Sequence, residues 1–300
     1  TPTTMVFSTQ PSGAISGSSF TAQPVVAVKD LEGNTVTSAT DSVTVSITSG
    51  TGAAGASLAG TATASAVKGV ATFTSLRIDK AGTGYTLTAS SGSLSSAVSS
   101  TFDVSAAAAY ILVITSEPST TAAGEAFSTQ PVAQIQDAYG NVITSSSASV
   151  TASITANTGA AGATLSGSKT VNAPTGVATF SGLSIDKAGS GYTLTLSSNG
   201  LASAVTSEFS ILSASASALA FSVQPSGGTA GDTSALSTTV VITDSLGNIV
   251  TDASSDITVA ITSGTGDSSG ELLGTATVTA LNGIATFSAV RIEKAASGYT

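Results

Sequence analysis

Three aspartates stand at equivalent places in turns of the chain, and their carboxylates are the groups best suited to hold a metal ion. Each begins a five-residue stretch ending in Gly-Asn, and the stretches are residues 30–34, 137–141 and 244–248. Calcium prefers loop oxygens, so the calcium candidates are Asp30, Asp137 and Asp244. An aspartate also accepts hydrogen bonds from its own turn, and Tyr139 stands where the first stretch has Glu32. We therefore expect turn-stabilising aspartates, with calcium the weaker alternative and no other cofactor.

Acidic residues followed by lysine form the charge pair that recurs in the chain. The pairs are Asp79-Lys80, Asp186-Lys187 and Glu293-Lys294. Neighbouring residues of a strand point to opposite faces, so we interpret the pairs as solvated charges at hairpin ends that discourage edge pairing. A salt bridge between neighbouring repeats is the alternative. A Lys–Asn isopeptide bond is disfavoured, because Lys29 is replaced by Gln136 and Thr243 in the other copies.

Catalytic groups are scarce. The chain has no histidine and no cysteine, so its many serines and threonines lack an activating base. The glycine-rich stretch 50–55 lacks the Gly-Lys-Ser/Thr ending of a phosphate-binding loop. We therefore expect no enzymatic activity. O-linked glycans on the hydroxyls stay open.

The residues described so far recur because the chain is a tandem repeat. Tyr192 follows Tyr85, and Tyr299 follows Tyr192, at a spacing of 107 residues. This period is too long for a solenoid unit and suits a whole small domain. The expected modules are residues 1–106, 107–214 and 215–300, the third incomplete.

Each module alternates apolar and hydroxylated residues with a period of two, which is typical of a strand with one buried face. In one such strand Val26 and Val28 form the expected buried set, and Ala27 and Lys29 the exposed set. Glycines that suit left-handed turn positions recur in register at Gly33, Gly140 and Gly247. Aromatic residues expected in the core recur in register at Phe73, Phe180, Phe287, Tyr85, Tyr192 and Tyr299. A core position is the default expectation for the aromatics, and Tyr139, alone in its turn, is the candidate for a surface contact.

Seven or eight strands per module, with frequent turn signals, predict an all-β fold of three tandem immunoglobulin-like antiparallel β-sandwiches. The third is expected to lack its closing strand, which corresponds to residues 101–104 and 208–211. Either the sequence cuts this module or a neighbouring chain supplies the strand. The linkers at 105–109 and 213–217 are only five residues long, so neighbouring modules can move little relative to each other. We therefore expect a semi-rigid, end-to-end rod.

The composition of the chain argues against two kinds of partner, nucleic acid and the membrane interior. Net charge is −9 with only eight Lys and Arg, too few cations for a phosphate track, so nucleic acid is not an expected partner. The longest apolar run, residues 106–114, is far shorter than the roughly 20 residues of a membrane span, so no direct membrane insertion is expected. Absence of cysteine fits a prokaryotic surface protein.

Several motifs together resemble bacterial immunoglobulin-like repeats of the invasin/intimin type. They are Gln10-Pro11, the turn 30–34, the stretch 69–73 and the stretch 80–88. The resemblance covers all three modules and implies an extracellular, cell-surface location and a stalk-like role without a catalytic motif. Tyr85 and Leu87 also stand like the corner tyrosine and second cysteine of an immunoglobulin domain.

These observations predict a non-catalytic structural segment of a secreted repeat protein, acting as a stalk, surface-layer or filament element. Its expected partners are copies of itself or neighbouring modules, with surface glycans as a further candidate. The alternative is a set of adhesin modules that bind carbohydrate or a host-cell protein. A spacer within a hydrolase is a third, weaker hypothesis.

Overall fold

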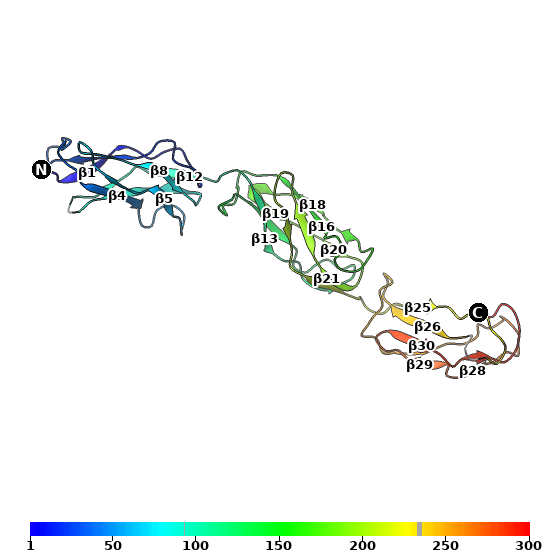
Figure 1. Ribbon diagram of the computed structural model, residues 1–300. Coiled ribbons are helices and arrows are strands. Elements are labelled where there is room, and N and C mark those ends of the chain that lie inside the picture. The colour runs from blue at the N-terminus through cyan, green and yellow to red at the C-terminus, as the bar shows by residue number, and fades with distance from the viewer. Residues whose placement is uncertain (93, 233–235) are drawn as a thin grey trace.

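The computed structural model describes residues 1–92, 94–232 and 236–300 and is built almost entirely of β-strands. Three groups of strands follow one another along the chain, from the blue N-terminal group to the red C-terminal group (Figure 1). Within the described residues, no helix is long and apolar enough to cross a membrane. The all-β, immunoglobulin-like architecture predicted from the sequence is confirmed.

The described residues of module one form twelve strands. They are β1 (Thr4–Thr9), β2 (Ala14–Ile15), β3 (Val25–Lys29), β4 (Ser42–Ile47), β5 (Leu58–Thr61), β6 (Thr63–Ser65), β7 (Val70–Thr72), β8 (Thr74–Ile78), β9 (Gly82–Tyr85), β10 (Leu87–Ser90), β11 (Ala97–Val98) and β12 (Phe102–Ser105). They form sheets in the orders β1-β3-β7, β11-β10-β4-β6, β2-β12-β9 and β5-β8. Strand β1, which precedes Pro11, lies at a sheet edge, where a residue without an N–H group is tolerated.

Module two repeats this arrangement. Its strands are β13 (Ile111–Ser116), β14 (Thr121–Ala122), β15 (Val132–Gln136), β16 (Ser149–Ile154), β17 (Leu165–Ser166), β18 (Thr170–Asn172), β19 (Val177–Thr179), β20 (Ser184–Ile185), β21 (Gly189–Tyr192), β22 (Leu194–Ser197), β23 (Ala204–Val205) and β24 (Phe209–Leu212), with a 3-10 turn at Pro174–Gly176. The sheet orders β13-β15-β19, β18-β16-β22-β23, β14-β24-β21 and β17-β20 match those of module one. One sequence pattern thus gives one topology twice.

Module three has fewer strands. They are β25 (Ala218–Val223), β26 (Thr238–Thr243), β27 (Asp256–Thr258), β28 (Leu272–Leu273), β29 (Thr277–Thr279), β30 (Ile284–Phe287) and β31 (Arg291–Ile292). Its described residues contain no counterpart of β9, and the counterparts of β10, β11 and β12 would follow residue 300, the last of the sequence. The β9 counterpart, residues 296–299, is present in the chain but is not a strand. Strand β9 is paired by β12, so its conformation depends on that partner.

Buried apolar side chains form three separate clusters. The first includes Val26, Val28, Phe73 and Tyr85, and the second repeats the same positions in module two. The third is smaller and centres on Val240, Ile242 and Phe287. Ala106, the last residue assigned to module one, packs against the second cluster. The boundaries drawn at 106/107 and 214/215 stay predictions.

Apolar and polar residues alternate along the strands, and the inward-facing apolar side chains form these clusters. Val43 and Val45 of β4 are buried, while Ser42 and Thr44 are exposed. The outward hydroxyls pair across strands; those of Thr44 and Thr63 lie 2.9 Å apart. Such cross-strand contacts stabilise a sheet while its surface stays hydrated.

One detail of the predicted pattern is wrong. Ala27, assigned to the exposed set, is only 3% exposed. It pairs with Val6 on one side and Val70 on the other, in the central strand of its sheet. A small side chain between two larger neighbours is covered by them, so it is buried on a face that the period alone marks as exposed.

A glycine beneath each corner tyrosine carries a close packing contact. Gly52 has φ of 70°, and a Cβ atom there would lie 2.2 Å from the Tyr85 ring. Gly159 and Gly266 make the same approach to Tyr192 and Tyr299. Only a residue without a side chain allows both the left-handed backbone and the contact.

We predict that Gly52→Ala destabilises module one more than Gly55→Ala does. Both glycines have positive φ, which costs an alanine about 1–2 kcal/mol. A Cβ at Gly55 meets open space, whereas at Gly52 it displaces the tyrosine ring, which adds about 1–3 kcal/mol. Denaturant unfolding of the two variants measures the difference. Equal losses of stability would contradict the packing role.

Candidate functional site

The three Asp-to-Asn turns are built alike around the aspartate carboxylate. In module two, Asp137 Oδ1 accepts hydrogen bonds from the backbone N–H of Tyr139 and of Asn141, both at 2.9 Å. Asp30 and Asp244 accept the equivalent bonds in their own turns. The turn-stabilising role expected from the sequence is present in every copy. We call residues 30–34, 137–141 and 244–248 the docking turns, because the second and third of them contact the preceding module.

The second carboxylate oxygen reaches the module before it. Asp137 Oδ2 accepts a hydrogen bond from Ser16 Oγ at 2.6 Å and another from the backbone N–H of Ala107 at 2.9 Å. Ser16 belongs to module one and Ala107 to the connection between the modules. Asp244 Oδ2 accepts from the backbone N–H of Ala214 at 3.0 Å. Both aspartates are almost fully buried, at 1% and 2% exposure.

The asparagines that end the second and third docking turns make a second contact with the preceding module. Asn141 Oδ1 accepts from the Ala81 N–H at 2.9 Å, and Asn141 Nδ2 donates to the Asp79 carbonyl oxygen at 2.9 Å. Asn248 repeats both bonds, with Ala188 N–H at 3.0 Å and the Asp186 carbonyl at 2.9 Å. We call residues 79–81, 186–188 and 293–295 the socket loops, and each contact between a turn and a loop a joint.

The socket loop is held by the core of its own module. The Tyr85 hydroxyl donates to the Lys80 carbonyl oxygen at 2.8 Å, which is the backward bond of a tyrosine corner. Tyr192 and Tyr299 make the same bond to Lys187 and Lys294. The Asp79 carboxylate accepts from the N–H and the hydroxyl of Ser57, each at 2.8 Å. The surface that receives the next module is therefore fixed from two sides.

These contacts correct the interpretation of two of the acid-lysine pairs, Asp79-Lys80 and Asp186-Lys187, as solvated charges, whereas Glu293-Lys294 is exposed. Asp79 and Asp186 bind their own modules through their carboxylates, and their carbonyl oxygens bind the next docking turn. Lys80 Nζ donates to the Tyr139 carbonyl oxygen at 3.3 Å. The joint is therefore made by hydrogen bonds to backbone groups and not by the salt bridge considered as the alternative.

Tyr139 makes a further contact with module one at the first joint. A Cβ atom at Gly17 would lie 1.8 Å from its ring, so the tyrosine packs directly on this glycine of module one. Leu246 approaches Gly124 at the second joint in the same way. The surface contact expected of Tyr139 is thus made to the preceding module.

Hydrogen bonding sets the ionisation of the joint aspartates. Burial opposes the charged form of Asp137, but bonds from Ser16, Asn141 and Ala107 outweigh it and lower its pKa to about 2. The pKa of Asp244 is also lowered, against burial, by Asn248 and Ala214. The carboxylates stay ionised without a positive partner because several donors point at each of them.

The same bonds do not fit calcium at Asp137 and Asp244. N–H and O–H donors point at their oxygens from the positions that a cation would need. In the described part of the chain, no group of three or more acidic or other ligating side chains could hold a metal. The chemistry of the repeated aspartates is that of a hydrogen-bonded contact.

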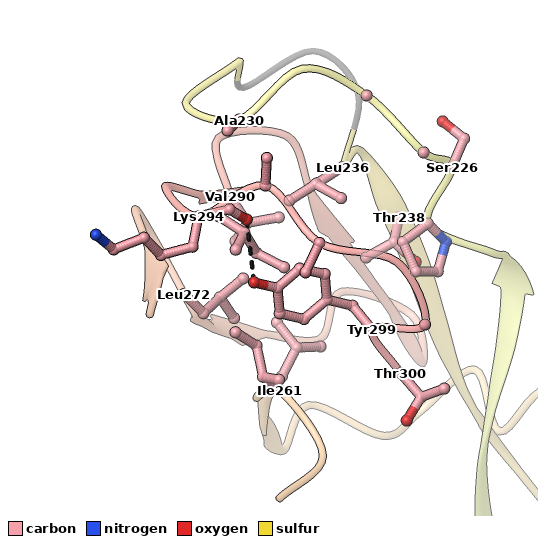
Figure 2. A pocket seen from close by; sticks show the side chains of 18 of the residues that line it. Ser226, Ala230, Leu236, Thr238, Ile261, Leu272, Val290, Lys294, Tyr299 and Thr300 are labelled. Carbon is pink, nitrogen blue, oxygen red and sulfur yellow. Dashed lines mark hydrogen bonds between the residues drawn. The ribbon is translucent and has the colours of Figure 1, made fainter. Parts of the chain in front are cut away.

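Module three contains an apolar cavity of about 430 Å³ beside residues 294–300 (Figure 2). Its walls include Leu236, Val259, Leu272, Val290 and Tyr299. In modules one and two the equivalent tyrosines are covered, because Phe102 stacks on Tyr85 and Phe209 on Tyr192, with ring centroids 5.9 Å apart. The cavity is the counterpart of core space in the other modules.

Solved structures with a similar arrangement include bacterial adhesins. FdeC, an adhesin of Escherichia coli, is 19% identical; the match covers 99% of this chain and 94% of that chain, with a TM-score of 0.38. Invasin, a bacterial integrin-binding protein, is 16% identical over 96% of this chain and 54% of that chain, with a TM-score of 0.34. A β-glycosidase from Bacteroides vulgatus is 15% identical over 69% and 25%, with a TM-score of 0.27.

No protein-family model and no curated protein matches the chain. One of these solved structures is invasin, after which the type of repeat that the sequence motifs resemble is named. Every quoted TM-score lies below 0.5, so these likenesses do not indicate a function for this chain.

We predict that Asp137→Ala loosens the first joint, whereas Asp30→Ala leaves its geometry unchanged. Both changes remove the bonds within a docking turn, but only the first removes bonds to the preceding module. Each hydrogen bond to a charged group contributes about 1.5–3 kcal/mol. Pairs of spin labels on introduced cysteines, in a chain without natural cysteine, measure the width of the distance distribution between modules one and two. Equal widths in the two variants would rule out the contact.

The first joint should also loosen in strong acid. The pKa of Asp137 in the folded protein is about 2, below the ordinary value of 3.8. A lowered pKa means that the stabilisation is complete above 3.8 and is lost as the pH falls through 2. The same distance distribution should stay constant from pH 7 to pH 4 and broaden toward pH 2. Asp137→Asn, which cannot ionise, should show no such transition; a joint unaffected at pH 2 would contradict the assignment.

Proposed function

We propose that the chain is a structural segment of a prokaryotic cell-surface protein, in which successive modules are held in a set orientation as a rod. The observation that carries this proposal is the repetition of the joint. The same docking-turn and socket-loop atoms meet twice, 107 residues apart. A contact that recurs with the repeat sets a recurring relation between neighbours.

The joint is suited to fix the orientation of one module relative to the next, and not to bind a ligand that comes and goes. Short connections already limit reach. The two aspartates lie in nearly complete burial, and their bonds are directed at backbone groups whose positions the two sandwiches set. A domain interface of this kind restricts the hinge motion that is otherwise expected between domains.

A stalk, a surface-layer element and a filament all use such a rod, and we place the segment outside the cell on the resemblance of its repeat motifs. We also propose that this segment has no catalytic role, since its repeated polar residues are used in turns and joints. Tyr139, the residue that suggested adhesion by a single module, is used in the first joint.

Small-angle X-ray scattering and binding assays on the intact chain test the proposal. We expect an elongated particle whose pair-distance function shows the module spacing, together with no saturable binding to glycan arrays or to cells. Asp137→Ala should shorten the apparent length by allowing bending at the first joint. A compact or freely bending wild-type particle would overturn the rod, and saturable binding would favour adhesion.

A further inference from the structure

The docking turn of module one has the same internal structure as the two turns that form joints. Asp30 Oδ1 accepts from the N–H of Glu32 at 3.1 Å and from the N–H of Asn34 at 2.8 Å. Asn34 Nδ2 donates to Asp30 Oδ2 at 3.3 Å, as Asn141 Nδ2 does to Asp137 Oδ2 at 2.9 Å. These bonds hold the carboxylate and the carboxamide in place, and a site organised in advance loses less entropy on binding.

The docking turn of module one differs from the other two docking turns because its residues are exposed to solvent. Leu31, Glu32, Gly33 and Asn34 are all exposed, Leu31 at 89%. Asn141 and Asn248, the counterparts of Asn34, are buried beneath socket loops. The turn of module one thus presents at the surface the atoms that the other two copies use for contact.

We propose that the docking turn 30–34 is a binding site for the socket-loop end of another module of this same repeat. Asn34 would pair with the carbonyl oxygen and the N–H group of a loop such as residues 186–188. Asp30 Oδ2 would accept from the N–H group that follows the last strand of that module. This inference rests on the proposed function, because it extends the observed joint to a third turn.

Charge favours the same partner. Glu32 occupies the place of Tyr139 and Leu246, the residues that lie against Gly17 and Gly124. At the first joint this place adjoins a lysine, since Lys80 donates to the Tyr139 carbonyl oxygen. A glutamate there would stand near a loop that carries a lysine of opposite charge, while the neighbouring acidic residues Asp79 and Asp186 are bonded within their own modules.

A tandem chain tests the inference. Asp30 precedes Asp244 by 214 residues, so joining residues 1–214 directly to a complete second chain puts the second-copy docking turn 30–34 where residues 244–248 normally lie. Spin labels on Lys169→Cys in the first copy and Ser65→Cys in the second report the distance across the new junction. Both positions are exposed.

We expect a single narrow distance distribution across the new junction. Asp30→Ala or Asn34→Ala in the second copy should broaden it to the width that Asp137→Ala produces at the native first joint. Asp41→Ala, which removes a carboxylate elsewhere in the same module, is the matched control and should change nothing. Circular dichroism confirms that each variant keeps its strands.

The outcomes separate the two proposals. If Asp137→Ala broadens the native joint but Asp30→Ala leaves the new junction unchanged, the docking site at residues 30–34 is overturned and the proposed rod is retained. If neither change has an effect, both proposals fail. Broadening by Asp30→Ala and Asn34→Ala, but not by Asp41→Ala, supports the docking site.

Discussion

A buried carboxylate with two separate sets of partners is the interaction on which the arrangement of the modules depends. Asp137 Oδ1 accepts from its own turn, and Oδ2 accepts from Asn141 of that turn, from Ser16 of the module before it and from Ala107 of the connection. A buried charge without such partners would cost several kcal/mol. The aspartate therefore folds the turn and joins it to its neighbour at once.

The position of each socket loop follows from packing inside its own sandwich. Tyr85 lies over Gly52, is stacked by Phe102, and holds the Lys80 carbonyl through its hydroxyl. This carbonyl belongs to the socket loop, and the next residue of the loop, Ala81, donates its N–H to Asn141. Core packing in one module is thus transmitted to the orientation of the next through a short series of contacts.

The two joints differ in detail while keeping the same backbone contacts. Ser16, which donates to Asp137, is replaced by Ala123 at the second joint, and Tyr139 is replaced by Leu246. Hydrogen bonds to N–H and C=O groups do not depend on which side chain the partner carries. A joint built on backbone groups therefore tolerates substitution among repeats, and it depends less on salt than one built on exposed ion pairs would.

Local pattern in the sequence was enough to predict the all-β fold, the Asp-to-Asn turns and the buried aromatics such as Phe73 and Tyr85. These features depend on alternation and on turn preferences, which the residues themselves express. The expected seven or eight strands per module were too few, because the described residues of modules one and two form twelve shorter strands each. The burial of Ala27 was missed, because it depends on the neighbours Val6 and Val70 in adjacent strands.

The joints were decided by the tertiary structure. The sequence does contain a signal: asparagine ends all three docking turns, while the second and third positions vary. It could not identify the partners, because Ala107 and Ala81 contribute N–H groups and Asp79 a carbonyl oxygen. Every residue carries these groups apart from the N–H that proline lacks, so only the folding of two sandwiches shows which of them face the turn.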